Sequence, residues 1–299
     1  MNIAILNWRD LAHSDAGGAE FFVHEVGRRW VEEGHSVTVL SSRPPRLPSD
    51  DVQDGVRIRR IGRLRDASHH FLAPRAAVSE AIMPDVLLES VNTIPYFLPL
   101  RRNLTTPFGT LVHQMARDVW RYHLPGPLAH MAQWAEPRLY TPYRHRTIAA
   151  VSNSTKVDLE AAGVQDVKVI PQGGPGRHSL QVEKEKDPTF LFVGRLTANK
   201  RPDHALEAFR LIRRDLPTAR LWVIGDGPMR AKLMRDAPLG TLFFGRVDRR
   251  ELLERMARAH LLLVTSVREG WGLVVTEANS LGTPALAYDV PGLRDSVVN

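Results

Sequence analysis

The chain has 299 residues, which is enough for two α/β domains or for one large one. It is 43% hydrophobic and 24% charged, as ordinary globular proteins are, and no apolar run approaches the roughly 18–20 residues that span a bilayer. The segment from Met1 to Leu6 lacks the cationic region and cleavage site of a signal peptide, and the chain has no cysteine for disulfides or thiolate metal sites, so we expect a cytoplasmic protein.

The net charge of +7 raises the question of an anionic partner. The densest cationic cluster consists of Arg57, Arg59, Arg60, Arg63 and Arg65. Two interpretations remain open: a solvated face of a strand and a loop, or a surface that contacts an anionic acceptor or the inner face of an anionic membrane. Nucleic acid is not expected as a partner, because no recognised reading module accompanies the charge.

In the first half of the chain, short apolar runs alternate with amphipathic stretches, which is typical of parallel βαβ units. A helix is predicted from Ala19 to Gly34, and another after Ser152, which we expect to be its N-cap. The segment 117–146, rich in Trp, Tyr and His, is also predicted to be helical. Strands are predicted at residues 3–6, 37–40, 56–61, 85–91, 108–113, 147–151 and 167–170.

Residues 171–188 combine breakers and charge without periodicity, and they divide the chain into domains of residues 1–172 and 173–299. A second βα series follows, with strands predicted at 190–193, 221–224, 242–244, 261–264 and 284–287. The fold class is therefore α/β, with two Rossmann-like, doubly wound parallel-sheet domains. Two such domains are expected to place a ligand cleft between the carboxyl ends of their strands.

Three motifs follow predicted strands. The first is Gly17-Gly18-Ala19-Glu20, where two glycines let the backbone approach a ligand and a helix N-terminus offers N–H groups to an anion. It lacks the spaced three-glycine fingerprint of nicotinamide-binding proteins, and a plain turn is the alternative. The second motif is Gly194-Arg195-Leu196 with Lys200. Its two cations at a strand tip favour a diphosphate site over a solvated basic loop.

The third motif is Glu269-Gly270-Trp271-Gly272-Leu273, followed by Glu277. Glu269 lies on a loop, where its carboxylate can accept hydrogen bonds from sugar hydroxyls. Glu277 is predicted about two turns into the next helix, where a carboxylate suits a ribose diol. The alternative, an exposed helix residue, is disfavoured because its apolar neighbours indicate a helix packed on a sheet.

The seven-residue spacing of Glu269 and Glu277 resembles the E-x7-E element of retaining GT-B glycosyltransferases, and the chain is similar to family 4, also called group 1. The resemblance covers almost the whole chain, and its landmarks occur in the usual order. They are Gly17-Gly18-Ala19-Glu20, Val151-Ser152-Asn153-Ser154, Gly194-Arg195-Leu196 with Lys200, Gly225-Asp226-Gly227-Pro228 and Phe244-Gly245-Arg246-Val247.

The resemblance implies a hexosyltransferase-type enzyme that takes its sugar from a nucleotide diphosphate sugar. Arg195 and Lys200 would hold the donor diphosphate and stabilise the leaving group. Glu269 would bind hydroxyls of the transferred sugar, and Glu277 would bind the ribose. The backbone that assists Glu269 would come from Gly270, Trp271, Gly272 and Leu273.

Further donor contacts are implied elsewhere. The loop carrying Arg246 and Val247 would border the nucleobase, with Gly225 also on the donor side, and Gly17 and Gly18 would approach the phosphates from the other domain. His113, at a predicted strand end, matches a position where such enzymes often carry a histidine near the donor sugar. A structural histidine is the alternative.

The family mechanism needs no metal or other cofactor, because fixed cations stabilise the departing nucleotide. Retention without an obvious enzymic nucleophile implies front-face attack, with a phosphate oxygen helping to deprotonate the acceptor hydroxyl. The acceptor, a glycan, lipid or small molecule, would face the first domain. The aromatic segment Trp120-Arg121-Tyr122-His123 either lines this face or packs in the core.

Two departures from the family pattern stand out. The family commonly has Pro-Asn-Gly-Val-Asp where this chain has Pro171-Gln172-Gly173-Gly174-Pro175, so the interdomain loop is expected to differ in shape. Relatives also continue past the position of Asn299, so the second domain is expected to be incomplete. The remaining alternatives are a nucleotide-sugar epimerase or phosphorylase of the same fold, and a catalytically silent protein that binds a polyanion or a membrane.

Overall fold

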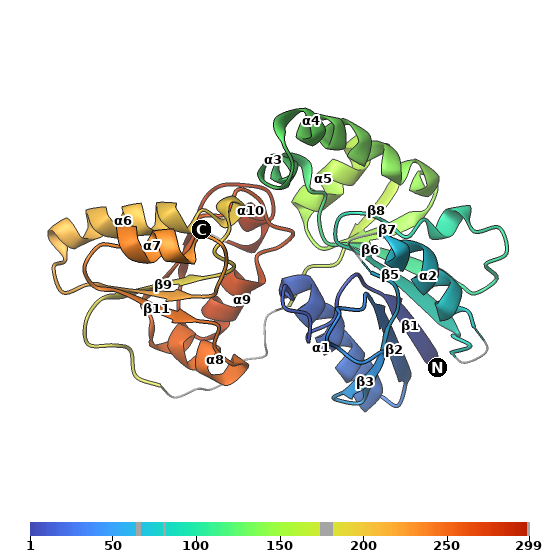
Figure 1. Ribbon diagram of the computed structural model, residues 1–299, viewed down its shortest axis with the longest axis horizontal. Helices are drawn as coiled ribbons and strands as arrows, with labels where there is room; N and C mark the ends of the chain where they lie inside the picture. The colour runs from blue at the N-terminus through green and yellow to red at the C-terminus, as the bar shows by residue number, and fades with distance from the viewer. Residues whose placement is uncertain (64–66, 80–81, 174–181, 298–299) are drawn as a thin grey trace. The chain divides into compact units, whose positions relative to one another are not determined.

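The computed structural model describes residues 1–63, 67–79, 82–173 and 182–297. They form two compact units. The first comprises residues 1–117 and 127–172, and the second comprises residues 118–126 and the chain from Gly173 onward. Each unit is built on its own β-sheet (Figure 1).

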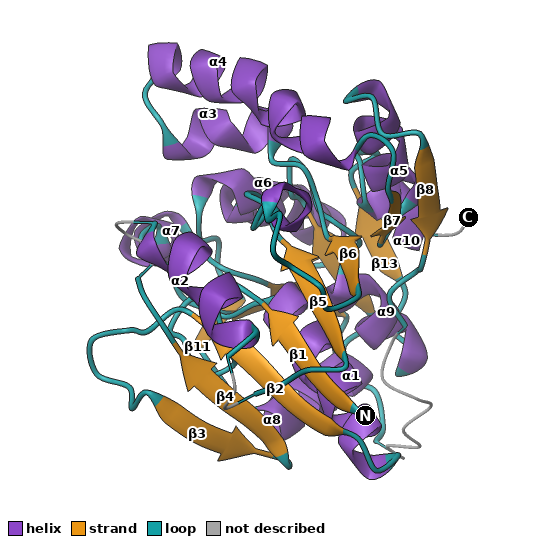
Figure 2. Cartoon of the chain, turned by 90° about the vertical axis from the view of Figure 1, so that its right-hand side faces the viewer, coloured by secondary structure: helices purple, strands orange, loops and turns teal. Residues whose placement is uncertain are grey.

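The first unit has an eight-stranded sheet in the order β3-β4-β2-β1-β5-β6-β7-β8, seen side by side in Figure 2. All neighbouring strands are parallel except β3 and β4. Its elements are β1 (Asn2–Leu6), α1 (Gly18–Glu32), β2 (Ser36–Ser41), β3 (Asp50–Gln53), β4 (Val56–Arg60), α2 (Ser68–Ala77), β5 (Val86–Val91), η1 (Leu98–Leu100), β6 (Phe108–Val112), α4 (Gly126–Ala135), η3 (Glu136–Tyr143), β7 (Thr147–Ala150), α5 (Asn153–Ala161) and β8 (Asp166–Val169).

Helices cover both faces of this sheet because side chains alternate along β1. Ile3 and Ile5 pack in one core cluster with Val23 of α1, whereas Ala4 and Leu6 pack in another with Ala73 and Ala77 of α2. A strand buried on both faces is apolar throughout, and this is why the run from residue 3 to 6 predicts it. The expected N-cap is also present: the Ser152 hydroxyl accepts a hydrogen bond from the Thr155 N–H at 3.1 Å.

The antiparallel edge strand β3 was not predicted, because Asp-Asp-Val-Gln has little strand propensity. Tertiary pairing compensates, since Asp50 lies opposite Arg59 of β4 and their side chains form an ion pair at 3.8 Å. The hairpin turns at Asp54 and Gly55, both with positive φ (49° and 79°). The Asp-Gly pair is a turn signal that could have revealed the hairpin from the sequence.

The second unit has a five-stranded parallel sheet in the order β11-β10-β9-β12-β13. Phe192 packs with Leu206 of α6 on one face, and Leu191 packs with Val275 of α9 on the other. The elements are η2 (Arg117–Val119), which straddles the boundary between the units, α3 (Trp120–His123), β9 (Thr189–Val193), η4 (Ala198–Lys200), α6 (Pro202–Asp215), β10 (Arg220–Ile224), α7 (Arg230–Asp236), β11 (Thr241–Gly245), α8 (Arg249–Arg258), β12 (Leu261–Val264), α9 (Leu273–Ser280), β13 (Ala285–Ala287) and α10 (Leu293–Ser296).

The aromatic segment that contains α3 does not pack in a core. Arg121, Tyr122 and His123 are exposed, and the Tyr122 hydroxyl accepts a hydrogen bond from Nη2 of Arg201 at 3.2 Å. Across the described ranges, no helix combines the length and the apolar character that a membrane crossing requires.

Both sheets are doubly wound, so each has a point where the strand order reverses. In the second sheet, the chain moves from β9 outward to β10 and β11 and then returns to place β12 on the other side of β9. Ligands of such sheets bind outside the carboxyl ends of the strands at this reversal. A ligand site is therefore expected at the loops that follow β9 and β12.

Candidate functional site

The loops that follow β9 and β12 are joined to each other by hydrogen bonds. The Val267 N–H donates to the Asn199 carbonyl at 3.0 Å, and the Thr265 hydroxyl donates to the Arg201 carbonyl at 2.7 Å. The first contact joins two backbone atoms and the second joins the Thr265 side chain to a backbone carbonyl, so the loop after β12 is held against the backbone of the loop after β9.

Lys200 and Glu269, which are 69 residues apart in the sequence, form an ion pair at this place. Oε1 of Glu269 accepts a hydrogen bond from Nζ of Lys200 and another from the hydroxyl of Ser266, at 2.6 Å. The side chains of Lys200 and Glu269 are 20% and 17% exposed, so both remain accessible to a ligand. The structure thus brings together two site residues that come from separate motifs.

Arg195 belongs to the same loop as Lys200. It is half-buried, and within the described chain its guanidinium has no hydrogen-bond or ion-pair partner. Because no group of the described chain neutralises Arg195 and the same loop carries Lys200, the loop can attract an anion such as a diphosphate.

The loop after β10 requires glycine at position 225. Its φ is +130°, and a Cβ atom there would lie 1.9 Å from the carbonyl oxygen of Gly194. The Leu196 N–H donates to the Asp226 carbonyl at 2.9 Å, which holds the two loops together. Gly225 therefore supports the backbone before Arg195, and Asp226 supports the backbone after it.

The Gly270–Leu273 segment leads directly into α9. Gly272 is the N-cap, with φ of +91°, and a Cβ atom there would lie 2.8 Å from Leu293. The Val275 N–H donates to the Gly272 carbonyl at 2.8 Å, whereas the N–H groups of Leu273 and Val274 have no acceptor within the helix, so they can receive an anion. The indole N–H of Trp271 is buried and has no hydrogen-bond acceptor in the described chain.

Glu277 lies just over one turn into α9, closer to its start than predicted, and it is buried as expected. Its Oε1 forms an ion pair with Nη1 of Arg249, the first residue of α8, at 2.7 Å. Burial raises the pKa of the Glu277 carboxyl above its usual value, and the charge and hydrogen bond of Arg249 act in the opposite direction. A largely buried carboxylate with one cationic partner is therefore available at the nucleotide end of the predicted site.

The loop after β11 carries the residues predicted to border a nucleobase. Arg246 is exposed, whereas Val247 is half-buried and packs against the core cluster of the second unit. Phe244 precedes this loop at the end of β11, and the guanidinium of Arg255 lies 3.5 Å from the centroid of its ring. Phe244 is therefore engaged within the fold, and Arg246 is the side chain that remains exposed.

In the first unit, Gly17 is the N-cap of α1 and Gly18 is its first residue, and both are exposed. The Gly17 N–H donates to the Glu20 carboxylate at 2.7 Å, and the same carboxylate accepts from the indole of Trp8 at 2.7 Å. A Cβ atom at Gly17 would meet only that carboxylate, at 3.7 Å. Internal packing therefore does not require glycine at this position.

His113, which directly follows β6, is buried, and both ring nitrogens have partners. Nδ1 lies 3.0 Å from the amide nitrogen of Gln172, and Nε2 lies 2.9 Å from the Ser90 hydroxyl, which donates to Oδ1 of Asn7 at 3.1 Å. Burial lowers the pKa of His113 to about 4, so the ring is neutral at pH 7. Gln172 holds this ring at the point where the loop departs from the family pattern; Gly174 and Pro175 of that loop lie outside the described residues.

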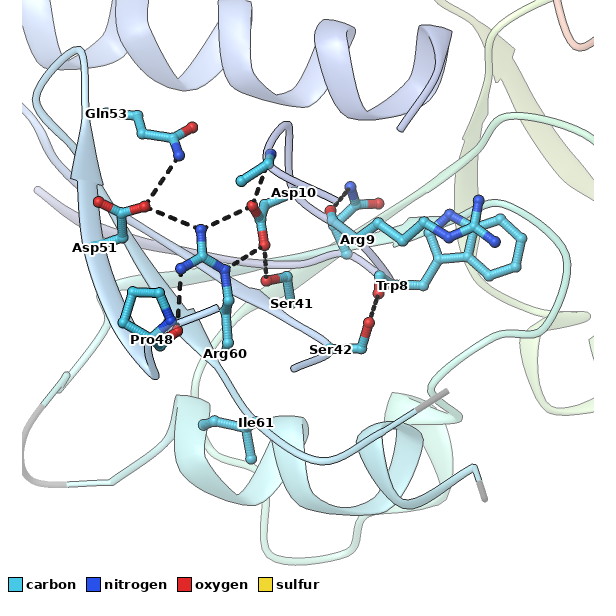
Figure 3. Close-up of polar contacts among 12 residues, drawn as sticks. Trp8, Arg9, Asp10, Ser41, Ser42, Pro48, Asp51, Gln53, Arg60 and Ile61 are labelled. Atoms are coloured by element: carbon cyan, nitrogen blue, oxygen red, sulfur yellow. Dashed lines mark hydrogen bonds and ion pairs between the residues drawn. The ribbon is translucent and has the colours of Figure 1, made fainter. Parts of the chain in front are cut away.

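The cationic cluster is less uniform than either interpretation expected. Arg60 is buried and pairs with Asp10 at 2.9 Å and with Asp51 at 3.0 Å (Figure 3). Burial pushes the pKa of Asp10 upward, but hydrogen bonds from Arg60 and Ser41 outweigh it and hold that pKa below its usual value. Arg60 is thus a structural cation, which corrects its assignment to a solvated or membrane-facing surface. Of the remaining members of the cluster, Arg57 and Arg63 are exposed, Arg59 is half-buried, and Arg65 lies outside the described residues.

Three residues of the site escaped sequence reasoning. Ser266 lies three residues before Glu269, and that short spacing is a signal that could have suggested the hydrogen bond. Arg249 gave no signal, because its partner is on another helix. Gly292 packs on the Glu269 backbone, where a Cβ atom would lie 2.1 Å from the carbonyl oxygen, and only the tertiary contact reveals this role.

Comparison with known proteins identifies the chain. The model of Glycosyltransferase Family 4 matches residues 16–173, and the model of Glycosyl transferases group 1 matches residues 178–299. The chain belongs to glycosyltransferase family 4. This family 4 chain is an enzyme that transfers a sugar from a nucleotide sugar, and its fold is the GT-B fold.

Its similarity to curated glycosyltransferases extends along the chain. It is 26% identical to a glycogen synthase of Mycobacterium tuberculosis over 337 aligned positions, covering 100% of this chain and 80% of that protein. It is 25% identical to a D-inositol 3-phosphate glycosyltransferase of Jonesia denitrificans, covering 95% of this chain and 78% of that protein.

Solved structures share the fold at lower identity. A sucrose-phosphate synthase of Thermosynechococcus elongatus matches with a TM-score of 0.75 and 19% identity, over 98% of this chain and 82% of that one. HepE of Anabaena, solved in complex with UDP and glucose, matches with a TM-score of 0.68 and 17% identity, over 98% of this chain and 82% of that one.

Proposed function

We propose that this family 4 enzyme retains the configuration at the anomeric carbon and uses Arg195, Lys200 and Glu269 as its central site residues. The observation that carries the proposal is the Lys200–Glu269 ion pair, with Arg195 on the same loop as Lys200 and without a hydrogen-bond or ion-pair partner for its guanidinium in the described chain. The two cations bind the donor diphosphate and stabilise the charge that builds on it as the anomeric C–O bond breaks. Glu269 accepts hydrogen bonds from hydroxyls of the transferred sugar.

The other predicted contacts surround these three residues. Glu277 binds the ribose, the Arg246–Val247 loop borders the nucleobase, and Gly17 and Gly18 approach the phosphates. His113 acts near the donor sugar as a neutral ring, because burial keeps its pKa far below 7. In the first unit, the exposed N-terminus of α1 supports the assignment of the two glycines.

The acceptor hydroxyl attacks from the face that the nucleotide leaves. Its oxygen forms the new bond to the anomeric carbon, the bond to the phosphate oxygen breaks, and that oxygen takes the acceptor proton. The chemistry needs no divalent metal, because Arg195 and Lys200 supply positive charge where the leaving group develops its negative charge. Turnover is therefore expected to continue in EDTA.

The acceptor is a hydroxyl compound, and the relatives suggest what to try. Curated relatives named glycogen synthase and D-inositol 3-phosphate glycosyltransferase make a glucan and an inositol phosphate the first acceptors to test. Contact with an anionic membrane would use Arg57 and Arg63, since Arg60 is buried. Sedimentation with vesicles containing anionic lipid, compared with neutral vesicles, tests that contact.

The decisive experiment is donor turnover followed by determination of the product's anomeric configuration. UDP-glucose, GDP-mannose and ADP-glucose are supplied with each acceptor, and the product is examined by NMR spectroscopy. The wild-type protein should give a product with the donor's configuration, and Glu269→Gln should lower turnover by at least about 100-fold, or roughly 3 kcal/mol of transition-state stabilisation. An inverted product would refute retention.

A matched control separates loss of chemistry from loss of folding. Glu254 is a carboxylate of the same unit that pairs with Arg250 on an exposed face of α8, so Glu254→Gln should leave turnover unchanged. If the epimerase alternative holds, the donor is converted without a hydroxyl acceptor, and if the phosphorylase alternative holds, a glycoside is cleaved only when inorganic phosphate is supplied. The polyanion-binding alternative predicts no consumption of any donor.

A further inference from the structure

The nucleotide end of the proposed site contains an ion pair between two helices. Nη1 of Arg249 at the start of α8 lies 2.7 Å from Oε1 of Glu277 on α9. The Glu277 side chain is 8% exposed, and the Arg249 side chain is 36% exposed. Within the described residues, Glu277 has no other side-chain partner. The position of its carboxylate therefore depends on one guanidinium.

Both ends of this pair are held by the fold. Asp248 caps α8, because its carboxylate accepts a hydrogen bond from the Glu251 N–H at 2.8 Å. Further along, Met256 of α8 and Val275 of α9 pack in the same core cluster. Arg249 therefore extends from a fixed helix start toward a fixed neighbouring helix, which limits the directions in which it can place the carboxylate.

The chemistry of the carboxylate explains why its orientation matters. An ionised carboxylate only accepts hydrogen bonds, and its two oxygens can receive both hydroxyls of a ribose. Burial opposes the charged form, and within the described residues no second polar side chain orients the carboxylate. A guanidinium bound at Oε1 favours the charged form of the carboxylate and defines the plane in which its oxygens lie.

We propose that Arg249 is a positioning residue that aims the Glu277 carboxylate at the ribose hydroxyls of the bound nucleotide. This inference rests on the proposed function, in which Glu277 binds the ribose. It predicts that Arg249 determines how strongly the enzyme prefers a ribonucleotide to a 2′-deoxyribonucleotide, although its own guanidinium need not touch the sugar.

Isothermal titration calorimetry with nucleoside diphosphates tests the proposal directly. UDP, GDP and ADP are titrated into the wild-type protein, and the tightest binder is compared with its 2′-deoxy counterpart. The wild type should prefer the ribonucleotide by about tenfold or more, as expected for a hydrogen bond to a charged group. In Arg249→Met and Arg249→Gln the ratio should fall toward one, because the ribonucleotide loses two hydrogen bonds to the carboxylate and the 2′-deoxy compound, which keeps only the 3′-hydroxyl, loses one.

Two further variants distinguish positioning from a general structural role. Arg250→Met removes the adjacent arginine, whose side chain is 88% exposed and pairs with Glu254, and it should keep the wild-type ratio. Glu277→Gln should lower the ratio, and adding Arg249→Met to it should lower the ratio no further. Thermal unfolding without nucleotide shows which variants fold, and either Arg249 variant suffices.

The outcomes separate this inference from the function on which it rests. If the wild type binds nucleotides but both folded Arg249 variants keep the full ribose preference, the inference is overturned and the proposed function stands. Equal losses for the ribonucleotide and the 2′-deoxy compound would also overturn it, because they indicate a structural role. If no nucleotide binds to the wild type, the proposed function fails and this inference fails with it.

Discussion

Replacing Gly225 with alanine should distort the loop that carries Arg195. The new Cβ atom would lie 1.9 Å from the Gly194 carbonyl oxygen, and the φ of +130° is one that alanine adopts only with strain. Overpacking of this kind costs about 1–3 kcal/mol, and the backbone strain adds about 1–2 kcal/mol. For a protein of this size, a total of about 2–5 kcal/mol lowers the unfolding temperature by roughly 4–20 °C.

Gly282→Ala is the matched control for that substitution. Gly282 lies in the same unit and also has a positive φ, +75°, but a Cβ atom there would have no neighbour within 4 Å. Its variant should therefore show only the strain of about 1–2 kcal/mol. Both variants are measured by thermal unfolding and by calorimetric titration with the nucleoside diphosphate that the wild type binds. Only Gly225→Ala should also weaken nucleotide binding, because it displaces the backbone beside Arg195. Equal unfolding temperatures and equal nucleotide affinities for the two variants would refute the reasoning.

Two further predictions concern the first unit. Arg60→Met should lower the free energy of unfolding by about 3–5 kcal/mol, because it leaves the buried Asp10 carboxylate without its cation. Arg59→Met, on the partly exposed side of β4, should lower it by less than about 1 kcal/mol. Chemical denaturation measures both variants, and equal effects would contradict the buried-pair argument. The pKa of His113 is lowered to about 4, so the unfolded chain binds the proton before the folded one as the pH falls from about 6.5 to 4. The free energy of unfolding should therefore fall by up to about 3 kcal/mol over that range. His113→Gln should reduce this acid sensitivity, and an unchanged dependence of stability on pH would show that the ring does not cause it.

The sequence predicted those parts of the fold that depend on local patterns. The apolar runs at residues 3–6 and 190–193 became central strands, because a strand covered on both faces must be apolar along its whole length. The N-cap at Ser152 was predictable for a similar reason, since capping requires only a hydroxyl at the right position beside the helix. The strand β3 was missed because its stability comes from pairing with β4 rather than from its own residues.

The candidate site divides in the same way. Motif spacing alone singled out Lys200 and Glu269, because glycines and charged residues at strand ends are visible in the sequence. That they form an ion pair was decided by the strand order. It places β12 beside β9, although 67 residues lie between Val193 at the end of β9 and Leu261 at the start of β12.

The burial of Arg60 and the ion-pair partner of Glu277 were decided only by the tertiary structure. Arg60 belongs to a run of arginines that look alike in the sequence, yet it alone among the described members is buried with two carboxylates. Glu277 was predicted to be buried, but nothing in the sequence indicated that Arg249 would reach it from another helix. The physical reason is that periodicity and spacing report the requirements of a residue's own segment, whereas an ion pair between segments depends on how the sheet brings them together.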